Sequence, residues 1–128
     1  MNDAQSWDVL LIDDEPVVLE VIRRVLEEEG LSVAVASDVA SGLAHRAGAT
    51  CRLVLCDLML PDGSGIDVIR TMRQRRRDLP MIVITGFATP ESAARAREAG
   101  AAGFLPKPFT DVELLDAVRR ALAGEGPE

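Results

Sequence analysis

The chain has 128 residues, of which 48% are hydrophobic and 27% charged, and its formal net charge at pH 7 is −7. This length suits one domain with its own core, so we expect a single domain over 1–128, with the core at about 8–123 and 124–128 as a tail or the start of a linker. The negative charge argues against a nucleic-acid-binding surface, which needs clustered lysine and arginine. No apolar run approaches the ~20 residues of a membrane-spanning helix, and residues 1–6 lack the features of a secretory signal, so we expect a cytoplasmic protein without membrane contact.

Five apolar runs of strand length alternate with helical patterns along the chain. Strands that are continuously apolar and alternate with helices predict a parallel sheet covered by helices on both faces. Right-handed crossovers leave few strand orders, and we expect 2-1-3-4-5, a choice that rests in part on the family resemblance described below. The strands are expected at 8–13, 32–36, 52–57, 81–85 and 103–106, and the helices at 16–29, 38–47, 66–76, 90–99 and 111–123.

Several helix ends carry local signals. Pro16 suits the first position of its helix, and Gly30 suits a left-handed cap at the end of that helix. Ser37 is the expected N-cap of the second helix. Thr110, followed three residues later by Glu113, predicts a capping box at the start of the last helix.

Two other groups of residues have a structural interpretation. Cys51 and Cys56 lie five residues apart around one strand, so alternation predicts opposite faces and no internal disulfide. Two such cysteines do not make a zinc site. An arginine cluster ends the helix at 66–76, where cations complement the helix dipole, and we interpret it as a solvated helix end. The cluster consists of Arg70, Arg73, Arg75, Arg76 and Arg77.

Polar residues stand where four of the expected strands end. Asp13 and Asp14 follow the first apolar run, Asp57 the third, Thr85 the fourth and Lys107 the fifth. The carboxyl ends of parallel strands share one edge of the sheet, and open α/β folds bind ligands there. Three acids, a hydroxyl and an ammonium at one edge predict a metal-assisted phosphoryl site.

The three acids need a cation. Clustered carboxylates raise each other's pKa unless a positive charge joins them, and Mg²⁺ binds a few carboxylates while keeping room for phosphate oxygens. Lys107 can pair with a carboxylate or a phosphoryl group, and the Thr85 hydroxyl can donate to a phosphoryl oxygen. Asp57 stands alone at its strand end, which makes it the best candidate for a nucleophile that forms an aspartyl phosphate.

Four motifs in this order, between about residues 9 and 122, resemble the receiver domain of response regulators in bacterial two-component systems. The resemblance implies a flavodoxin-like α/β fold with a single five-stranded parallel sheet and helices on both faces. It also implies a phosphoacceptor whose only reactions are its own phosphorylation and dephosphorylation. The motifs are Asp13-Asp14, Asp57 with Pro61-Asp62-Gly63, Thr85-Gly86, and Lys107-Pro108-Phe109.

The resemblance implies a role for each site residue. Asp57 would accept the phosphoryl group, and Asp14, Asp57 and the backbone carbonyl of Met59 would bind Mg²⁺, with Asp13 assisting through water. Lys107 and Thr85 would hold the phosphoryl oxygens, and the bond between Lys107 and Pro108 would be cis. Thr85 and an aromatic residue form the switch in this family. That residue is Phe104 here, where many members carry tyrosine, so we expect the switch to work by packing.

The resemblance also implies partners. A sensor histidine kinase or a phosphotransfer protein would donate the phosphoryl group. The output would pass to a downstream effector protein, or to an effector domain that this sequence does not contain. Neither nucleic acid nor membrane binding is expected of this domain, and the sequence leaves open whether it forms a homodimer.

Three other functions fit parts of the pattern. A Mg²⁺-dependent phosphohydrolase that uses an aspartyl phosphate needs a second acid two residues after the nucleophile, but Met59 stands there. A nucleotide- or flavin-binding domain needs a glycine-rich loop after the first strand, where Asp13-Asp14-Glu15-Pro16 stands instead. A docking module that is never phosphorylated would not need the complete set of acids, threonine and lysine.

Overall fold

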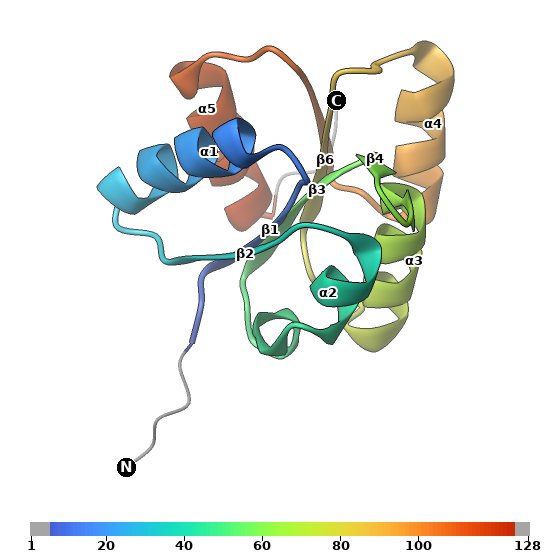
Figure 1. Ribbon diagram of the computed structural model, residues 1–128, viewed down its shortest axis with the longest axis horizontal. Coiled ribbons are helices and arrows are strands. Elements are labelled where there is room, and N and C mark those ends of the chain that lie inside the picture. The colour runs from blue at the N-terminus through green and yellow to red at the C-terminus, as the bar shows by residue number, and fades with distance from the viewer. Residues whose placement is uncertain (1–5, 125–128) are drawn as a thin grey trace.

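The computed structural model describes residues 6–124, and a parallel sheet lies between two layers of helices (Figure 1). Residues 125–128 of the predicted tail, and residues 1–5 at the N-terminus, lie outside the described part of the chain. Helices α1 and α5 cover one face of the sheet, and α2, α3 and α4 cover the other (Figure 1). None of the helices in the described range is long and apolar enough to cross a bilayer.

The predicted strand order is confirmed. The main sheet runs β2-β1-β3-β6-β7 with every neighbouring pair parallel, which is the order 2-1-3-4-5 of the five predicted strands. The strands are β1 Val9–Ile12, β2 Val33–Ala36, β3 Leu53–Asp57, β6 Met81–Thr85 and β7 Gly103–Pro106. The helices are α1 Pro16–Glu28, α2 Val39–Ala44, α3 Gly65–Arg75, α4 Pro90–Ala99 and α5 Asp111–Leu122, with a 3₁₀ helix, η1, at Arg46–Ala49.

Alternation along the central strands divides the core into two layers. In β1, Leu10 and Ile12 belong to the layer under α2, α3 and α4, whereas Val9 and Leu11 belong to the layer under α1 and α5. Every residue of β1 and β3 is buried. Strand β3 pairs with β1 on one side and with β6 on the other, which places the end of β3 inside the sheet.

A small hairpin connects β3 to α3. Its strands, β4 Met59–Leu60 and β5 Gly63–Ser64, pair antiparallel. The hairpin begins two residues after Asp57 and leads into α3, so it lies next to the predicted site.

The predicted helix at 38–47 is wrong in two respects. It ends at Ala44 because His45 has an extended backbone, and η1 follows. Its N-cap is Asp38, not Ser37: the Asp38 carboxylate accepts a hydrogen bond from the Ser41 N–H in a capping box. The capping box of Thr110 and Glu113 at the start of α5 is confirmed.

The two cysteines are free, as predicted, but they do not lie on opposite faces. Both are buried in the core layer under α2, α3 and α4. Cys51 precedes β3, which begins at Leu53, so strand alternation does not extend to it.

The prediction of a solvated helix end holds only in part: Arg70, Arg75 and Arg77 are exposed, but three members of the cluster also bind backbone carbonyls. Arg73 donates to the carbonyls of Gly100, at 2.7 Å, and Arg77. Arg75 donates to Leu43 at 2.7 Å. Arg76 donates to Cys51 at 2.7 Å and to Gly48 at 3.2 Å. These bonds tie the end of α3 to α2, to the segment before β3 and to the loop before β7.

Candidate functional site

The predicted acids meet at the carboxyl edge of the sheet. Strands β1 and β3 are neighbours with Ile12 opposite Cys56, so the residues that follow, Asp13 and Asp57, lie side by side. Oxygens of Asp13, Asp14 and Asp57 all lie within 4.8 Å of one another. Asp13 is fully buried and Asp57 is 5% exposed, whereas Asp14 faces solvent.

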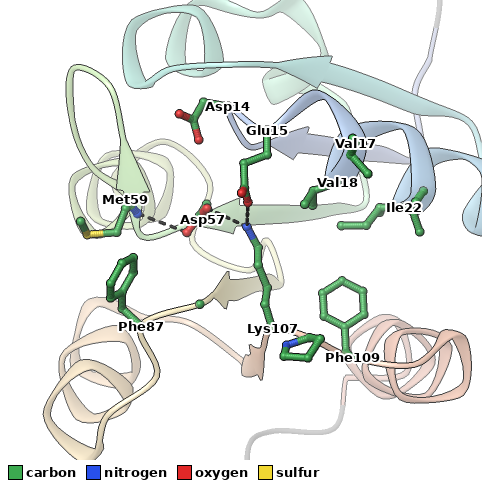
Figure 2. A pocket seen from close by; sticks show the side chains of 13 residues that line it. Asp14, Glu15, Val17, Val18, Ile22, Asp57, Met59, Phe87, Lys107 and Phe109 are labelled. Atoms are coloured by element: carbon green, nitrogen blue, oxygen red, sulfur yellow. Dashed lines mark hydrogen bonds and ion pairs between the residues drawn. The ribbon is translucent and has the colours of Figure 1, made fainter.

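Lys107 joins this group from the end of β7. Its ammonium lies 2.8 Å from Asp13 Oδ2. It also lies 2.9 Å from Asp57 Oδ2 and 2.7 Å from Glu15 Oε1, and Figure 2 draws these two contacts. Burial alone would lower the pKa of Lys107, but hydrogen bonds with the three carboxylates raise it above its ordinary value. Lys107 therefore stays charged at neutral pH. Its bond to Pro108 is cis, as the resemblance implied.

Asp13 is the acid most affected by the fold. Burial raises its pKa above the ordinary value, against hydrogen bonds with Lys107 and with the Glu15 N–H that lower it; the charge of Asp57 raises it further. One ammonium thus faces several carboxylates that the fold has partly removed from water. A further positive charge at this edge would relieve their repulsion.

Local contacts fix Asp57 in its position. Its Oδ1 accepts a hydrogen bond from the Met59 N–H at 3.2 Å, while Oδ2 faces Lys107. Behind it, α3 begins at Gly65, where a Cβ atom would overlap the carbonyl oxygen of Asp57. Only glycine lets α3 start this close to the end of β3.

Thr85 and Phe104 lie on the two neighbouring strands β6 and β7. Thr85 is fully buried at the end of β6, and its hydroxyl accepts a hydrogen bond from the Phe87 N–H at 3.0 Å. Phe104 lies on β7 opposite Val83, half-buried against the core layer under α2, α3 and α4. The hydroxyl of Thr85 is thus engaged with the backbone of its own loop.

A pocket of about 650 Å³ opens over Asp57 and Lys107 (Figure 2). Acids line one part of it, and α1 and the segment after Lys107 form an apolar wall. Val17 on α1, which belongs to this wall, is exposed. The lining residues are Asp14, Glu15, Val17, Val18, Val21, Ile22, Asp57, Met59, Gly86, Phe87, Lys107, Pro108 and Phe109.

The acid cluster has the donors that a small, hard divalent cation prefers. Three carboxylates from two adjacent strand ends converge on one region, and one of them is exposed to solvent. Oxygen ligands of this kind suit Mg²⁺, which keeps several waters and takes only a few protein ligands. The site therefore has the composition of a metal centre.

Two contacts were not predicted from the sequence, those of Glu15 and Asp62, although both residues stand in motifs named above. Glu15 contacts Lys107 across 92 positions of sequence. Asp62, at the tip of the β4–β5 hairpin, accepts hydrogen bonds from the backbone N–H groups of Val39 at 2.7 Å and Ala40 at 3.0 Å, at the start of α2. The acidic run Asp13-Asp14-Glu15 hinted at the first contact, but no local signal pointed to the second.

The sequence matches one known protein family over most of its length. The family model described as the response regulator receiver domain matches residues 9–119. The chain belongs to this family. Receiver domains belong to the response regulators of two-component systems, so the fold of this chain is that of a signalling domain.

Curated relatives of this receiver domain are bacterial regulators. It is 38% identical over 120 residues to the C4-dicarboxylate transport transcriptional regulatory protein DctD of Pseudomonas aeruginosa, an alignment that covers 94% of this chain and 26% of DctD. It is 37% identical over 110 residues to the acid tolerance regulatory protein ActR of Rhizobium meliloti, which covers 86% of this chain and 57% of ActR. The receiver domain thus spans only part of the length of these relatives.

Solved structures have the same fold over nearly their whole length. A CheY-like response regulator receiver domain protein from Methanospirillum hungatei matches with a TM-score of 0.87 and 28% identity, covering 94% of this chain and 96% of that one. The beryllofluoride-activated NtrC4 receiver domain dimer matches with a TM-score of 0.86 and 29% identity, covering 91% of this chain and 97% of that one.

The contact between Asp62 and α2 predicts a pH-dependent contribution to stability. Hydrogen bonds from the Val39 and Ala40 N–H groups lower the pKa of Asp62 below its ordinary value of 3.8. A lowered pKa stabilises the folded state above the unfolded-state pKa, and this contribution is lost as the pH falls through the folded-state pKa. We expect Asp62→Ala to lower the free energy of unfolding at about pH 7, by an amount that shrinks below about pH 4.

Urea unfolding across this pH range measures the effect, with Asp78→Ala as the matched control because Asp78 is an exposed acid outside the hairpin. A destabilisation by Asp62→Ala that stays constant down to about pH 3 would contradict the role of the ionised carboxylate.

Proposed function

We propose that this receiver domain takes a phosphoryl group onto Asp57 from a phosphohistidine of a sensor histidine kinase or a phosphotransfer protein, in a reaction that depends on Mg²⁺. The main support is the position of Asp57: its carboxylate contacts Lys107 and the Met59 N–H, lies among two further acids, and borders an open pocket. An Asp57 oxygen would attack phosphorus, and the P–N bond would break. The imidazole nitrogen would leave with the bonding electrons and take a proton from solvent.

Each residue of the site has a part in this transfer. Phosphoryl transfer asks a protein mainly for positioning and charge neutralisation. Lys107 lies beside Asp57 and can donate to an oxygen of a phosphoryl group there, and the Thr85 hydroxyl can donate to another. Asp14, Asp57 and the Met59 backbone carbonyl would hold Mg²⁺, with Asp13 assisting through water. When bound, Mg²⁺ neutralises charge on the acids and on the transferred group.

The residues around Asp57 favour a signalling phosphoacceptor over a phosphohydrolase. Two residues after Asp57, the side chain of Met59 is 55% exposed and borders the pocket. A thioether cannot carry a proton to a leaving group, so rapid turnover lacks its general acid. The phosphorylated form is therefore the product that a downstream effector protein or effector domain would read.

The decisive measurement is intact mass after incubation with acetyl phosphate and Mg²⁺. We expect the wild-type protein to gain the mass of one phosphoryl group and Asp57→Asn to gain none, because the amide is not a nucleophile. Wild type treated with a chelator is the control for the metal. Phosphorylation of Asp57→Asn to the wild-type extent, or full phosphorylation of wild type without Mg²⁺, would contradict the proposal.

The lifetime of the phosphorylated form depends on two apolar side chains. Met59 is 55% exposed and Phe87 is 65% exposed, and both line the pocket beside Asp57 (Figure 2). Neither can orient a water molecule for hydrolysis, so we propose slow self-dephosphorylation. Replacing both by polar groups, Met59→Asn with Phe87→Glu, is expected to speed the decay by roughly tenfold or more, as positioned polar groups do in hydrolysis.

Loss of the added mass with time, after removal of acetyl phosphate, measures this decay. The control is Met59→Leu with Phe87→Leu, which keeps both positions apolar and should decay at about the wild-type rate. Equal decay of the polar variant and the wild type would show that these positions do not limit hydrolysis.

The switch would couple Thr85 to Phe104. We propose that a phosphoryl oxygen draws the Thr85 hydroxyl away from the Phe87 N–H, and that Phe104 packs further into the space beside it. Phe104 has no hydroxyl, so packing alone drives the change. A structure with Mg²⁺ and beryllofluoride bound is expected to have a Phe104 side chain that is more buried than here. An unmoved or more exposed Phe104 would contradict this prediction.

A further inference from the structure

Glu15 contacts Lys107 but has no part in the reaction proposed above. It stands at the N-cap of α1 with an extended backbone, yet its side chain does not cap the helix. Its Oε1 instead lies 2.7 Å from Lys107 Nζ (Figure 2). Its own N–H donates to Asp13 Oδ1 at 2.9 Å. The Glu15 carboxylate therefore lies over the acid cluster, on the pocket side of Lys107.

The hydrogen-bonding capacity of Lys107 is fully used in this arrangement. A lysine ammonium has three N–H donors and no acceptor. Lys107 contacts three carboxylates, those of Asp13, Glu15 and Asp57, at 2.7 to 2.9 Å. A phosphoryl oxygen on Asp57 can gain an N–H from Lys107 only if one carboxylate releases it.

The three carboxylates differ in how easily they can leave. Asp13 is fully buried, so release of the ammonium would leave its charge unpaired away from bulk solvent. Asp57 carries the phosphoryl group and stays in place. The side chain of Glu15 is 58% exposed and can turn into solvent at small cost. Glu15 is thus the partner that Lys107 can exchange.

We propose that Glu15 competes with the phosphoryl group for Lys107 and thereby opposes phosphorylation of Asp57. This inference rests on the proposed function of Asp57. In the unphosphorylated protein, Glu15 holds the ammonium. A phosphoryl group must displace the Glu15 carboxylate and also meets its negative charge. Glu15 is therefore a positioning residue that sets how strongly the site favours its phosphorylated state.

Glu15 can be altered without removing a candidate metal ligand. Among the described residues, the carboxylates that lie within 4.8 Å of one another are those of Asp13, Asp14 and Asp57, and Glu15 is not in this group. Its exposure also predicts a specific signature: salt screens interactions between exposed charges, since the Debye length falls to ~3 Å at ~1 M salt.

The test compares the affinity for beryllofluoride, at saturating Mg²⁺, of wild type, Glu15→Gln and Glu15→Ala by titration calorimetry. We expect both variants to bind roughly three- to tenfold more tightly at low salt, the range of an exposed ion pair with a like-charge repulsion added. The difference should shrink at ~1 M salt. Self-phosphorylation by acetyl phosphate should also be faster in Glu15→Gln and Glu15→Ala than in wild type.

The control is Glu28→Gln, which removes an exposed carboxylate from the far end of α1 and should bind as wild type does. Glu15→Asp keeps the charge but shortens the side chain, so it should bind between wild type and Glu15→Gln. Urea unfolding of each variant separates a change in the site from a change in folding.

The possible results distinguish a failure of the role of Glu15 from a failure of the role of Asp57. Wild type that binds beryllofluoride while Glu15→Gln and Glu15→Ala bind equally or more weakly overturns the role of Glu15 and leaves Asp57 as the phosphoacceptor. A tighter binding that does not respond to salt also overturns it, because the competition is electrostatic. Wild type that binds no beryllofluoride and takes up no phosphoryl group overturns the proposed function, and this inference with it.

Discussion

The ammonium of Lys107 is the interaction on which the carboxyl edge of this receiver domain depends. Asp13 and Asp57 are almost completely removed from water, and buried charges are tolerated only where they are paired. Lys107 supplies that pairing with hydrogen bonds to both. One positive charge still faces the carboxylates of Asp13, Asp14, Glu15 and Asp57. The excess of negative charge favours binding of a divalent cation at this edge. It also means that Lys107 can release one carboxylate and bind another group in its place.

The fold holds the acids rigidly and leaves other parts of the edge less constrained. Asp57 ends a strand buried on both faces, and Gly65 lets α3 begin against its carbonyl. The hairpin that follows is tied to α2 through Asp62. By contrast, the buried residues of α4 are only Ala96 and Ala99, so little apolar area anchors this helix. Segments with few buried contacts are the ones that rearrange at low cost. The face that carries α4 is therefore suited to respond to a change at Thr85.

Much of the site could be predicted because its signals are local. A buried parallel strand is a continuous apolar run, and the residue that follows it must lie at the carboxyl edge. That reasoning brought Asp13, Asp14, Asp57, Thr85 and Lys107 to one region before any coordinates, and β6 and β7 have the predicted bounds. The strand order does not follow from this pattern alone, because several right-handed arrangements satisfy it and the family resemblance selects among them.

The sequence by itself determined the alternation of strands and helices, the residues at the strand ends and the capping box of α5, since each depends on periodicity or on neighbours a few positions away. Only the tertiary structure decided which remote groups meet. It brought Glu15 to Lys107, Asp62 to the start of α2 and the arginines of α3 to carbonyls of other segments. It also placed Cys51 in the same core layer as Cys56. These contacts join residues that are far apart in the sequence and come together only when the elements pack. No local sequence pattern encodes the distance between such residues.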